Sequence, residues 1–368
     1  MNQDKKREEK YLNASTRQLI WWRYKKHMLA MVGLVCIAGL YVVTIFCEFL
    51  APYDKDTRCL EAIYAPPSSV RILDKDGKLR RPFVYARNLE IDIETQRMSY
   101  KENPEERYPI KFFVKGDPYE FWGIWETDLH LFGVDAPGGL FLFGTDRMGR
   151  DMFSRCLYGS RISLSIGMVG VFLSLVLGLT LGGISGYMGG WADGVIQRIV
   201  EVIRCFPSIP LWMGLSAAMP PHWPALKVYF AITVILSLIG WTDLARMVRG
   251  KLFSLREEEF VLAARFAGAG HARIIFRHLL PSFTSHIIVT VTLAIPGMIL
   301  AETALSFLGI GLRPPITSLG VLLKEAQNVT TIALYPWLLI PVFFVILIVL
   351  SFNFVGDGLR DAVDPYSR

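Results

Sequence analysis

The fold of this 368-residue chain is decided by a polar stretch, RMVRGKLFSLREEEFVLAARFAGAGHARIIFRHLLP, at residues 246–281. The stretch carries seven Lys or Arg residues, two His and three Glu, and it separates two strongly apolar segments. Ala263 and Ala264 give it a small-residue helical face, Gly268 follows as a break, and Pro281 is expected to end a helix. Short loops rich in Lys and Arg stay on the cytoplasmic side of a membrane. We therefore expect a cytoplasmic docking element between two membrane spans.

Hydrophobic residues make up 52% of the chain, and they are gathered into runs. Spanning a bilayer takes about 20 helical residues, and lipid excludes unpaired backbone, so such runs predict transmembrane helices. Six runs qualify, at residues 28–50, 162–184, 195–219, 225–241, 286–308 and 332–355. The predicted fold class is an all-α membrane protein with six transmembrane helices and a large extracytoplasmic insertion between helices 1 and 2.

The distribution of charge predicts the topology. The first 26 residues carry eight Lys or Arg against three acidic residues, and the first apolar run is too long for a cleavable signal peptide, so we expect a retained anchor. The predicted organisation is a cytoplasmic N-terminus at 1–27, helix 1 at 28–50 and the outer insertion at 51–161. Helices 2–6 at 162–355 then form a core that contains the cytoplasmic loop 243–284. A cytoplasmic tail follows at 356–368.

The insertion is the part that can fold as a small globular unit. Val70-Arg-Ile-Leu73 before Asp76-Gly77 is a hairpin signal. A cap on the outer rim of the helices and a docking surface for a partner are both open as its role. Cys59 and Cys156 fall on the oxidising side of the predicted topology, so a bridge between them is one open possibility.

Polar residues inside the spans are rare, and three of them are candidates for lining a transport pathway: Glu201, Arg204 and Glu302. Arg198, Glu201 and Arg204 are also spaced for an ion-pair ladder, which is the alternative reading. Three glycines at 178, 182 and 186 share one helical face and predict close packing of two helices.

Several kinds of chemistry lack their motifs here. The chain has no phosphate-binding loop of the form G-x-x-x-x-G-K-[ST], no H-E-x-x-H, no G-x-S-x-G and no Cys/His cluster with metal-ligand spacing. We therefore expect no catalytic residues, no metal site, no cofactor in this chain and no nucleic-acid partner. An enzyme embedded in the membrane that uses Glu201 or Glu302 is the least favoured alternative.

The docking element itself is predicted to contain a helix at 261–267. Small residues on its face would let the groove of another protein approach closely, and Arg265, Arg273 and Arg277 would supply complementary charge. An amphipathic helix lying on anionic lipid is the alternative that the cations also allow.

At these residues the chain resembles a known family. Residues 260–281 resemble the "EAA" loop of the permeases of ATP-binding cassette (ABC) importers, in the form found in the dipeptide, oligopeptide and nickel class. Three further stretches resemble signatures of the same class: GTDRMGRDMFSR at 144–155, ETALSFLGIG at 302–311 and GDGLRDAVDP at 356–365. Together the matches cover about residues 140–368 and the first span.

The resemblance implies a permease subunit of the bacterial inner membrane with both termini in the cytoplasm. It implies as partners a second homologous permease, two cytosolic ABC ATPases that bind ATP and Mg²⁺, a periplasmic solute-binding protein and membrane lipid. The EAA loop would form the coupling helix that contacts an ATPase. By match, the contact residues would be Ala263, Ala264, Arg265, Ala267, Gly268 and Pro281. This chain departs from the motif at Leu262, where the family has Glu, at His278, where it has Ile, and at Arg204, where we expect an apolar residue.

The expected function is therefore to form half of a translocation pathway for peptides or peptide-like solutes, driven by the partner ATPases. Nickel chelates, opines and oligosaccharides stay open as solutes within the same class. A membrane scaffold that binds lipid or a partner other than an ATPase is the alternative from another class.

Overall fold

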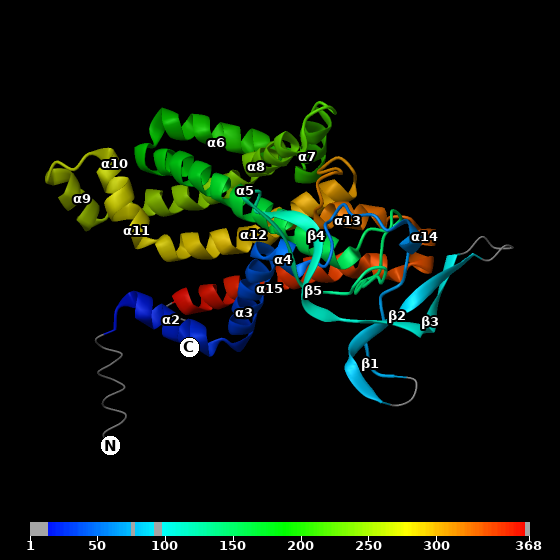
Figure 1. The fold of residues 1–368 in the computed structure, drawn as a ribbon. Coiled ribbons are helices and arrows are strands. Elements are labelled where there is room, and N and C mark those ends of the chain that lie inside the picture. Colours follow the sequence, from blue (N-terminus) through cyan, green and yellow to red (C-terminus); the bar gives the residue numbers. More distant parts are fainter. Residues whose placement is uncertain (1–13, 75–77, 92–97, 365–368) are drawn as a thin grey trace, which may run out of the picture. The chain divides into compact units, whose positions relative to one another are not determined.

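A computed structural model describes residues 14–74, 78–91 and 98–364 (Figure 1). The chain divides into two compact units, each assembled from segments that lie far apart in the sequence. The first unit comprises residues 1–38, 165–302 and 347–368, and the second comprises 39–164 and 303–346. The cytoplasmic-loop candidate falls in the first unit, and the predicted insertion falls in the second.

Helices dominate the first unit, and the second unit combines helices with all the strands of the described residues. Five helices are long and apolar enough to cross a membrane within the described ranges, and a sixth span is formed if one bent pair of helices is counted as a single span. The five are α3 (Met28–Ile45), α5 (Met152–Met188), α8 (Ala225–Leu255), α12 (Thr284–Phe307) and the span Pro336–Val363, which combines η3 (Pro336–Leu339) with α15 (Ile340–Val363). The bent pair is α6 (Gly190–Cys205) with α7 (Ser208–Ala217).

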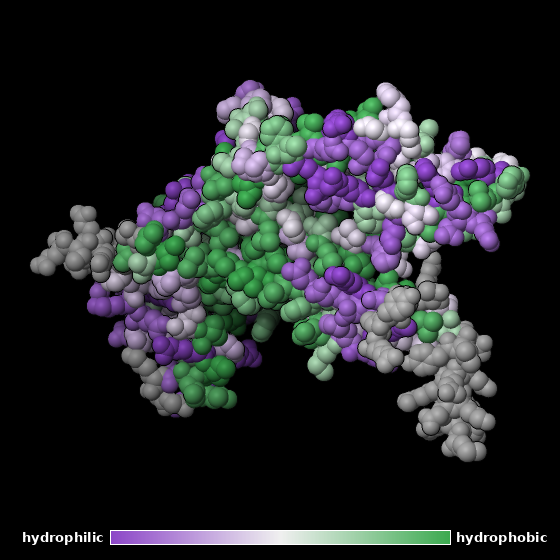
Figure 2. Space-filling model, turned by 180° about the vertical axis from the view of Figure 1, so that it is seen from behind, coloured by the Kyte–Doolittle hydropathy of each residue, from purple (hydrophilic) through white to green (hydrophobic). Residues whose placement is uncertain are grey.

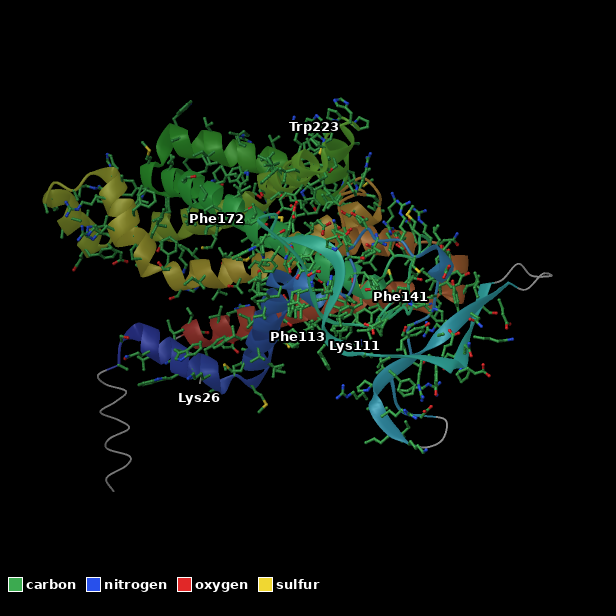
Figure 3. The ribbon with its side chains drawn as sticks, in the orientation of Figure 1. Lys26, Lys111, Phe113, Phe141, Phe172 and Trp223 are labelled. Carbon is green, nitrogen blue, oxygen red and sulfur yellow. The ribbon has the colours of Figure 1, made fainter. Side chains whose placement is uncertain are left out.

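The surface of the helices fits a membrane environment. Hydrophobic side chains gather in a broad patch over the helices on the face drawn in Figure 2, and hydrophilic side chains gather outside that patch. Phe172 on α5, labelled in Figure 3, is 62% exposed, as expected for a side chain that meets lipid rather than water.

The third predicted span, 195–219, differs from expectation because it is broken. Its two helices, α6 and α7, meet at 89° around Phe206 and Pro207. Proline disfavours helical backbone in the residue before it, and Phe206 accordingly adopts an extended conformation with φ −89° and ψ 136°. The run of apolar residues was visible in the sequence, and Pro207 was the signal for the break.

Helix lengths also differ from the apolar runs. Helix α5 begins ten residues before the predicted start at 162, and α8 runs on to Leu255, well past the predicted end at 241. Polar residues continue a helix readily once its apolar portion has formed, so hydropathy alone does not mark a helix end.

The glycine face of α5 packs against α8. A Cβ atom added to Gly182 would lie 2.6 Å from the carbonyl oxygen of Ala245, and one added to Gly186 would lie 2.7 Å from that of Arg249. Such spacing lets two helix backbones approach directly. The prediction that this face serves packing is confirmed.

The insertion contains strands, so the class "all-α" describes the spans only. Strands β1 (Arg71–Leu73), β2 (Leu79–Ile91) and β3 (Met98–Pro109) form an antiparallel sheet in the order β1-β2-β3. Strands β4 (Lys111–Phe121) and β5 (Trp125–Gly133) form an antiparallel pair. The hairpin predicted at residue 70 therefore exists as β1 and β2, while its turn, Asp76-Gly77, lies outside the described residues. Alternating and aromatic segments away from lipid can pair as strands because water satisfies the exposed edges.

Short elements connect these parts. They are α2 (Thr16–Lys26), α4 (Cys47–Leu50), η1 (Leu60–Ala62), α9 (Glu259–Phe266), α10 (His271–Arg273), the π-helix η2 (Ile274–Leu279), α11 (Leu280–Ser282), α13 (Leu319–Glu325) and α14 (Val329–Leu334). Helix α2 begins with a capping box formed by Ser15 and Gln18, and Arg23 donates a hydrogen bond of 3.0 Å to the carbonyl of Asp364. Helix α2 therefore lies beside the end of α15.

The cysteines are free thiols in the structure, so the possible bridge between Cys59 and Cys156 is not formed. Cys156 is fully buried on α5.

Candidate functional site

The polar stretch that opened the sequence is built as a helical hairpin between α8 and α12. After α8 ends at Leu255, a turn leads into α9, and α10, η2 and α11 return the chain to the start of α12. Figure 1 shows α9 and α10 at the end of the α8 and α12 helices. Helix α9 spans 259–266, close to the predicted 261–267.

Helix α9 is anchored to the bundle by its apolar side. Val261 is fully buried in a cluster that also contains Val248 and Leu252 of α8 and Ile274 of η2. Ala264 packs against the same cluster. The cluster also contains Ile287 of α12, so it joins α9 to both flanking spans.

Gly268 forms the break that the sequence predicted after the helix. Its φ is +80°, and it follows the C-cap of α9. The amide of Ala269 donates to the carbonyl of Ala264, and the amide of Gly268 donates to the carbonyl of Arg265, both at 3.0 Å. This pattern is a Schellman motif, in which glycine is favoured because other residues are strained at positive φ. Gly268 is therefore required for the turn whether or not it contacts a partner.

The small residues predicted an outward side of α9 that is nearly free of side chains, but large side chains project from it. Ala263 and Ala267 are exposed, but Phe266 projects among them with 90% of its surface exposed. Phe260 and Leu262 are also exposed. An exposed aromatic residue on an anchored helix is a feature of surfaces that insert into a partner. The position of Phe266 is visible in the sequence, but the burial of Val261, which determines which side of α9 faces out, came only from the fold.

Exposed arginines also occur in this stretch of the chain. Arg265 is exposed and lies 5.9 Å from the centre of the Tyr187 ring, and His271 Nδ1 lies 3.3 Å from the Tyr187 hydroxyl. Arg273 and Arg277 on the returning segment are exposed as well. We define Phe266 with Arg265, Arg273 and Arg277 as the α9 surface.

Pro281 lies in α11, the last turn of a continuous helical run from His271 to Ser282, and α12 begins after Phe283. The run ends one residue after Pro281, which agrees with the expectation of a helix-ending proline to within one residue.

A cavity of about 330 Å³ lies among the spans of the first unit. It is lined mainly by apolar residues of α5, α7, α8 and α12, with Ser174, Ser208, Asp243 and Thr290 as polar members. Trp212 of α7 also lines it, and its Nε1–H is buried with no hydrogen-bond partner. An apolar cavity with a few polar groups is the usual form of a small-molecule pathway or site.

The three predicted pathway residues differ in their relation to this cavity. Arg204 forms an ion pair with Asp243, which lines it. Glu201 instead pairs with Arg198 at 2.9 Å on an exposed face of α6. Glu302 is fully buried in α12, and neither Glu201 nor Glu302 is a lining residue. The ladder alternative is thus present only as the Arg198–Glu201 pair. Asp243 was missed because it falls in the predicted cytoplasmic loop 243–284, just past the predicted end of its span at 241. Trp212 was missed because nothing near it in the sequence distinguishes it from other apolar span residues.

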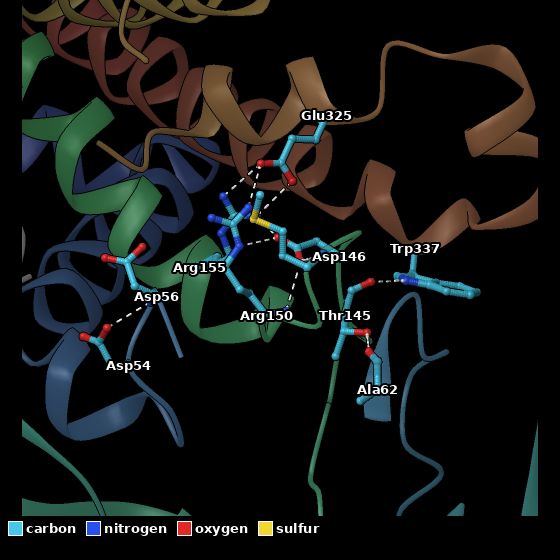
Figure 4. Close-up of polar contacts among 10 residues, drawn as sticks. Asp54, Asp56, Ala62, Thr145, Asp146, Arg150, Arg155, Glu325 and Trp337 are labelled. Carbon is cyan, nitrogen blue, oxygen red and sulfur yellow. Dashed lines mark hydrogen bonds and ion pairs between the residues drawn. The ribbon is translucent and has the colours of Figure 1, made fainter. Parts of the chain in front are cut away.

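The second unit holds a buried network of charges in the stretch 144–155 (Figure 4). Arg150 Nε lies 2.7 Å from Asp146 Oδ2 and its Nη2 lies 3.0 Å from Glu325 Oε1. Arg155 pairs with Asp146 and lies 3.0 Å from Glu325 Oε2. The two arginines and two acids balance in charge, and Arg155 is 1% exposed. The network joins the start of α5 to α13.

A second ion pair ties α4 to the same helix. Arg161 on α5 is paired with Glu48 and donates a hydrogen bond of 2.8 Å to the carbonyl of Thr44. These charge-assisted hydrogen bonds hold the N-terminal part of α5 against α4 and the end of α3.

Comparison with known proteins decides the family. The family described as "binding-protein-dependent transport system inner membrane component" matches residues 178–368, just over half of the chain. The chain belongs to this family of transport permeases. The N-terminal transmembrane domain of oligopeptide transport permease C matches residues 15–67. The resemblance to permeases of ABC transporters that the four motifs indicated is confirmed, and the members of this family are transport permease subunits rather than catalytic ones.

The permease is similar to two dipeptide transport system permease proteins. It is 42% identical to the one from Alkalihalophilus pseudofirmus over 233 residues, which are 63% of this chain and 74% of the relative. It is 32% identical to the one from Bacillus subtilis over 372 aligned positions, which are 100% of this chain and 92% of the relative. Among solved structures, an inward-facing methionine ABC transporter matches with a TM-score of 0.45 and 20% identity, over 58% of this chain and 98% of the other.

Proposed function

We propose that this permease forms half of the translocation pathway of an ATP-driven importer of peptides, and that the α9 surface couples it to a cytosolic ATPase. The observation that carries the coupling proposal is Phe266, which is 90% exposed on a helix whose other side is held in the core by Val261. Its relatives' names support peptides as the solute class. Nickel chelates, opines and oligosaccharides are the competing solutes.

The partners follow from the same proposal. Two ATPase subunits would bind ATP and Mg²⁺, a second homologous permease would complete the pathway, and a periplasmic protein would deliver the solute. This chain would hold no cofactor of its own. The aromatic side chain would enter a cleft of the ATPase, where burying it gains roughly 1.5–3 kcal/mol, and Arg265, Arg273 and Arg277 would meet acidic groups at the rim.

The coupling would work through rigid connections. Closure of the two ATPases on ATP would move α9, and the buried cluster around Val261 would carry that motion to α8 and α12. The cavity beside Asp243 and Arg204 lies between these spans, so their movement would change access to it. Of the predicted pathway residues, we retain Arg204 through its pairing with Asp243.

The orientation is part of the proposal. We place the α9 surface and both termini in the cytoplasm and the insertion in the periplasm, because Lys and Arg concentrate at the N-terminus and in residues 246–281. A membrane-impermeant thiol reagent added to spheroplasts should label a Leu60→Cys variant above the wild-type level and leave a Phe266→Cys variant at that level. The reverse pattern would exclude this orientation.

The experiment for coupling is solute-stimulated ATP hydrolysis by the assembled complex in proteoliposomes. Phe266→Ala should lower the stimulated rate at least about tenfold, since loss of one central aromatic anchor costs about 2 kcal/mol or more. Phe112→Ala is the matched control, because Phe112 is a comparably exposed phenylalanine on β4 in the insertion. Gly268→Arg is unsuitable, because it would also disrupt the Schellman turn.

The lipid-binding scaffold predicts a different result in the same preparation. If the α9 surface only binds anionic lipid, Phe266→Ala would leave stimulated hydrolysis unchanged and would weaken binding of the chain's loop to anionic vesicles. An unchanged rate in an intact complex therefore rejects the coupling role.

A further inference from the structure

The insertion contains a second cavity that the transport proposal does not use. Its volume is about 300 Å³, and it lies wholly within the second unit. Strands β2 and β3 form one side, and segments around residues 137–141 and 149–151 form another. Its walls include five aromatic side chains and one buried carboxylate: Tyr53, Tyr85, Tyr100, Tyr108, Phe141 and Asp151. Phe141 is labelled in Figure 3.

Asp151 has an acceptor that the protein does not use. Its Oδ2 receives hydrogen bonds of 2.7 Å from both the backbone amide and the hydroxyl of Ser154, which makes Asp151 the N-cap of α5. Its Oδ1 has no hydrogen-bond partner, and the residue is only 2% exposed, so this oxygen is also shielded from water. Buried carboxylate oxygens are almost always paired, so an unpaired one in the wall of a cavity indicates a missing donor.

The aromatic walls are held in place. The Tyr100 hydroxyl donates a hydrogen bond of 2.6 Å to the carbonyl of Ile63, and the Tyr53 hydroxyl accepts one of 2.9 Å from the amide of Leu140. Gly138 lies directly against Tyr108, because a Cβ atom on Gly138 would come within 2.4 Å of the ring. Rings fixed in this way present their faces and edges to the cavity without further ordering.

The charges of the lining favour a cation. Glu61 and Glu106 add to the carboxylate of Asp151, and Arg87 is the lining residue of opposite sign. The Arg87 guanidinium is already engaged with the backbone carbonyls of Pro66 and Pro67. The formal charges of these four lining side chains sum to −2, and aromatic faces attract cations by their quadrupole.

We propose that this cavity binds a small organic cation with a primary ammonium group, such as a free amine or the amino terminus of a short peptide. One N–H of the ammonium would donate to Asp151 Oδ1, and the tyrosine rings would surround the charge. A metal ion fits the lining poorly, because the described residues contain no group of three His, Cys, Asp or Glu side chains placed to hold one. The proposal is independent of the transport function, since it concerns the insertion alone.

The test is calorimetric titration of the full chain in lipid nanodiscs with n-butylammonium, with its neutral analogue 1-butanol, and with alanyl-alanine and N-acetyl-alanyl-alanine. We expect butylammonium to bind at least about tenfold more tightly than butanol. Alanyl-alanine that binds tightly, with loss of binding on acetylation, would identify a peptide amino terminus as the source. Binding of the amine alone would identify a free amine.

The variants locate the site. Asp151→Asn keeps an oxygen for the N-cap and should remove the preference for butylammonium, whereas Asp128→Asn, at an exposed carboxylate on β5, should keep it. Glu106→Gln changes an exposed lining residue and leaves the buried N-cap at Asp151 intact. It should weaken the binding of butylammonium about two- to threefold. Equal binding of butanol and butylammonium would overturn the proposal, and so would an undiminished preference in Asp151→Asn.

Discussion

Replacing Arg155 by Met tests whether the buried charge network holds the second unit together. Arg155 is 1% exposed and contacts both acids of the network, Asp146 and Glu325. Removing one partner of a buried ion pair costs about 3–5 kcal/mol, because the remaining charges are left without compensation. Arg150 still contacts Asp146 and Glu325 in the variant, so we expect the lower end, about 3 kcal/mol.

The assay is the free energy of unfolding from denaturant titration in mixed micelles, measured for a double-mutant cycle. Glu325→Gln restores the charge balance when it is combined with Arg155→Met. The double variant should therefore lose less stability than the sum of the single variants, by about 1–3 kcal/mol. Arg198→Met is the control, since it breaks the exposed pair with Glu201 and should change stability by at most about 0.5 kcal/mol. Additive losses for Arg155 and Glu325 would refute the reasoning.

Two further predictions concern stability. Burial raises the pKa of Asp151 to about 6, so between about pH 4 and 6 the folded state binds more protons than the unfolded state. The free energy of unfolding should therefore fall by on the order of 3 kcal/mol as the pH rises from about 4 to about 6. Asp151→Asn should remove this fall, and a pH profile of unfolding unchanged by the substitution would contradict it. Gly182→Ala should destabilise the permease by about 1–3 kcal/mol through overlap with the Ala245 backbone. Gly183→Ala, whose added Cβ meets nothing closer than 3.8 Å, should be neutral or slightly stabilising in the same unfolding assay, and equal losses would reject close packing of that face.

The spans and the loop were predictable because their signals are local. Hydropathy over about 20 residues marks a span, and a glycine at Gly182 marks a face that another helix approaches. The alternation of apolar and polar residues near Val70 also predicted the hairpin of strands β1 and β2. Pro207 is also a local signal for a bend, but it lies within a continuous apolar run, and the run led to the prediction of one unbroken span.

The candidate sites were less predictable because they depend on contacts across long sequence separations. Arg155 and Glu325 are 170 residues apart, so neither signals the other in the sequence. Asp243 lies just past the predicted end of its span at 241, and its place on a cavity wall came only from the fold. The exposure of Phe266 followed only from the burial of Val261 on the opposite side of α9. Motif matching predicted a helix at 261–267, where α9 lies, but it included Gly268 among the contact residues, whereas the positive φ of Gly268 explains its presence without a partner.

The most direct test of the central claim is photo-crosslinking from position 266. A photoreactive phenylalanine analogue placed there in the assembled complex should form a crosslink to the ATPase subunit, and the same analogue at position 112 should form none. The account predicts that the crosslink persists in both nucleotide-free and ATP-bound complexes, because α9 moves together with its partner. Crosslinks from position 266 that reach only lipid, in a complex containing both ATPases, would contradict it.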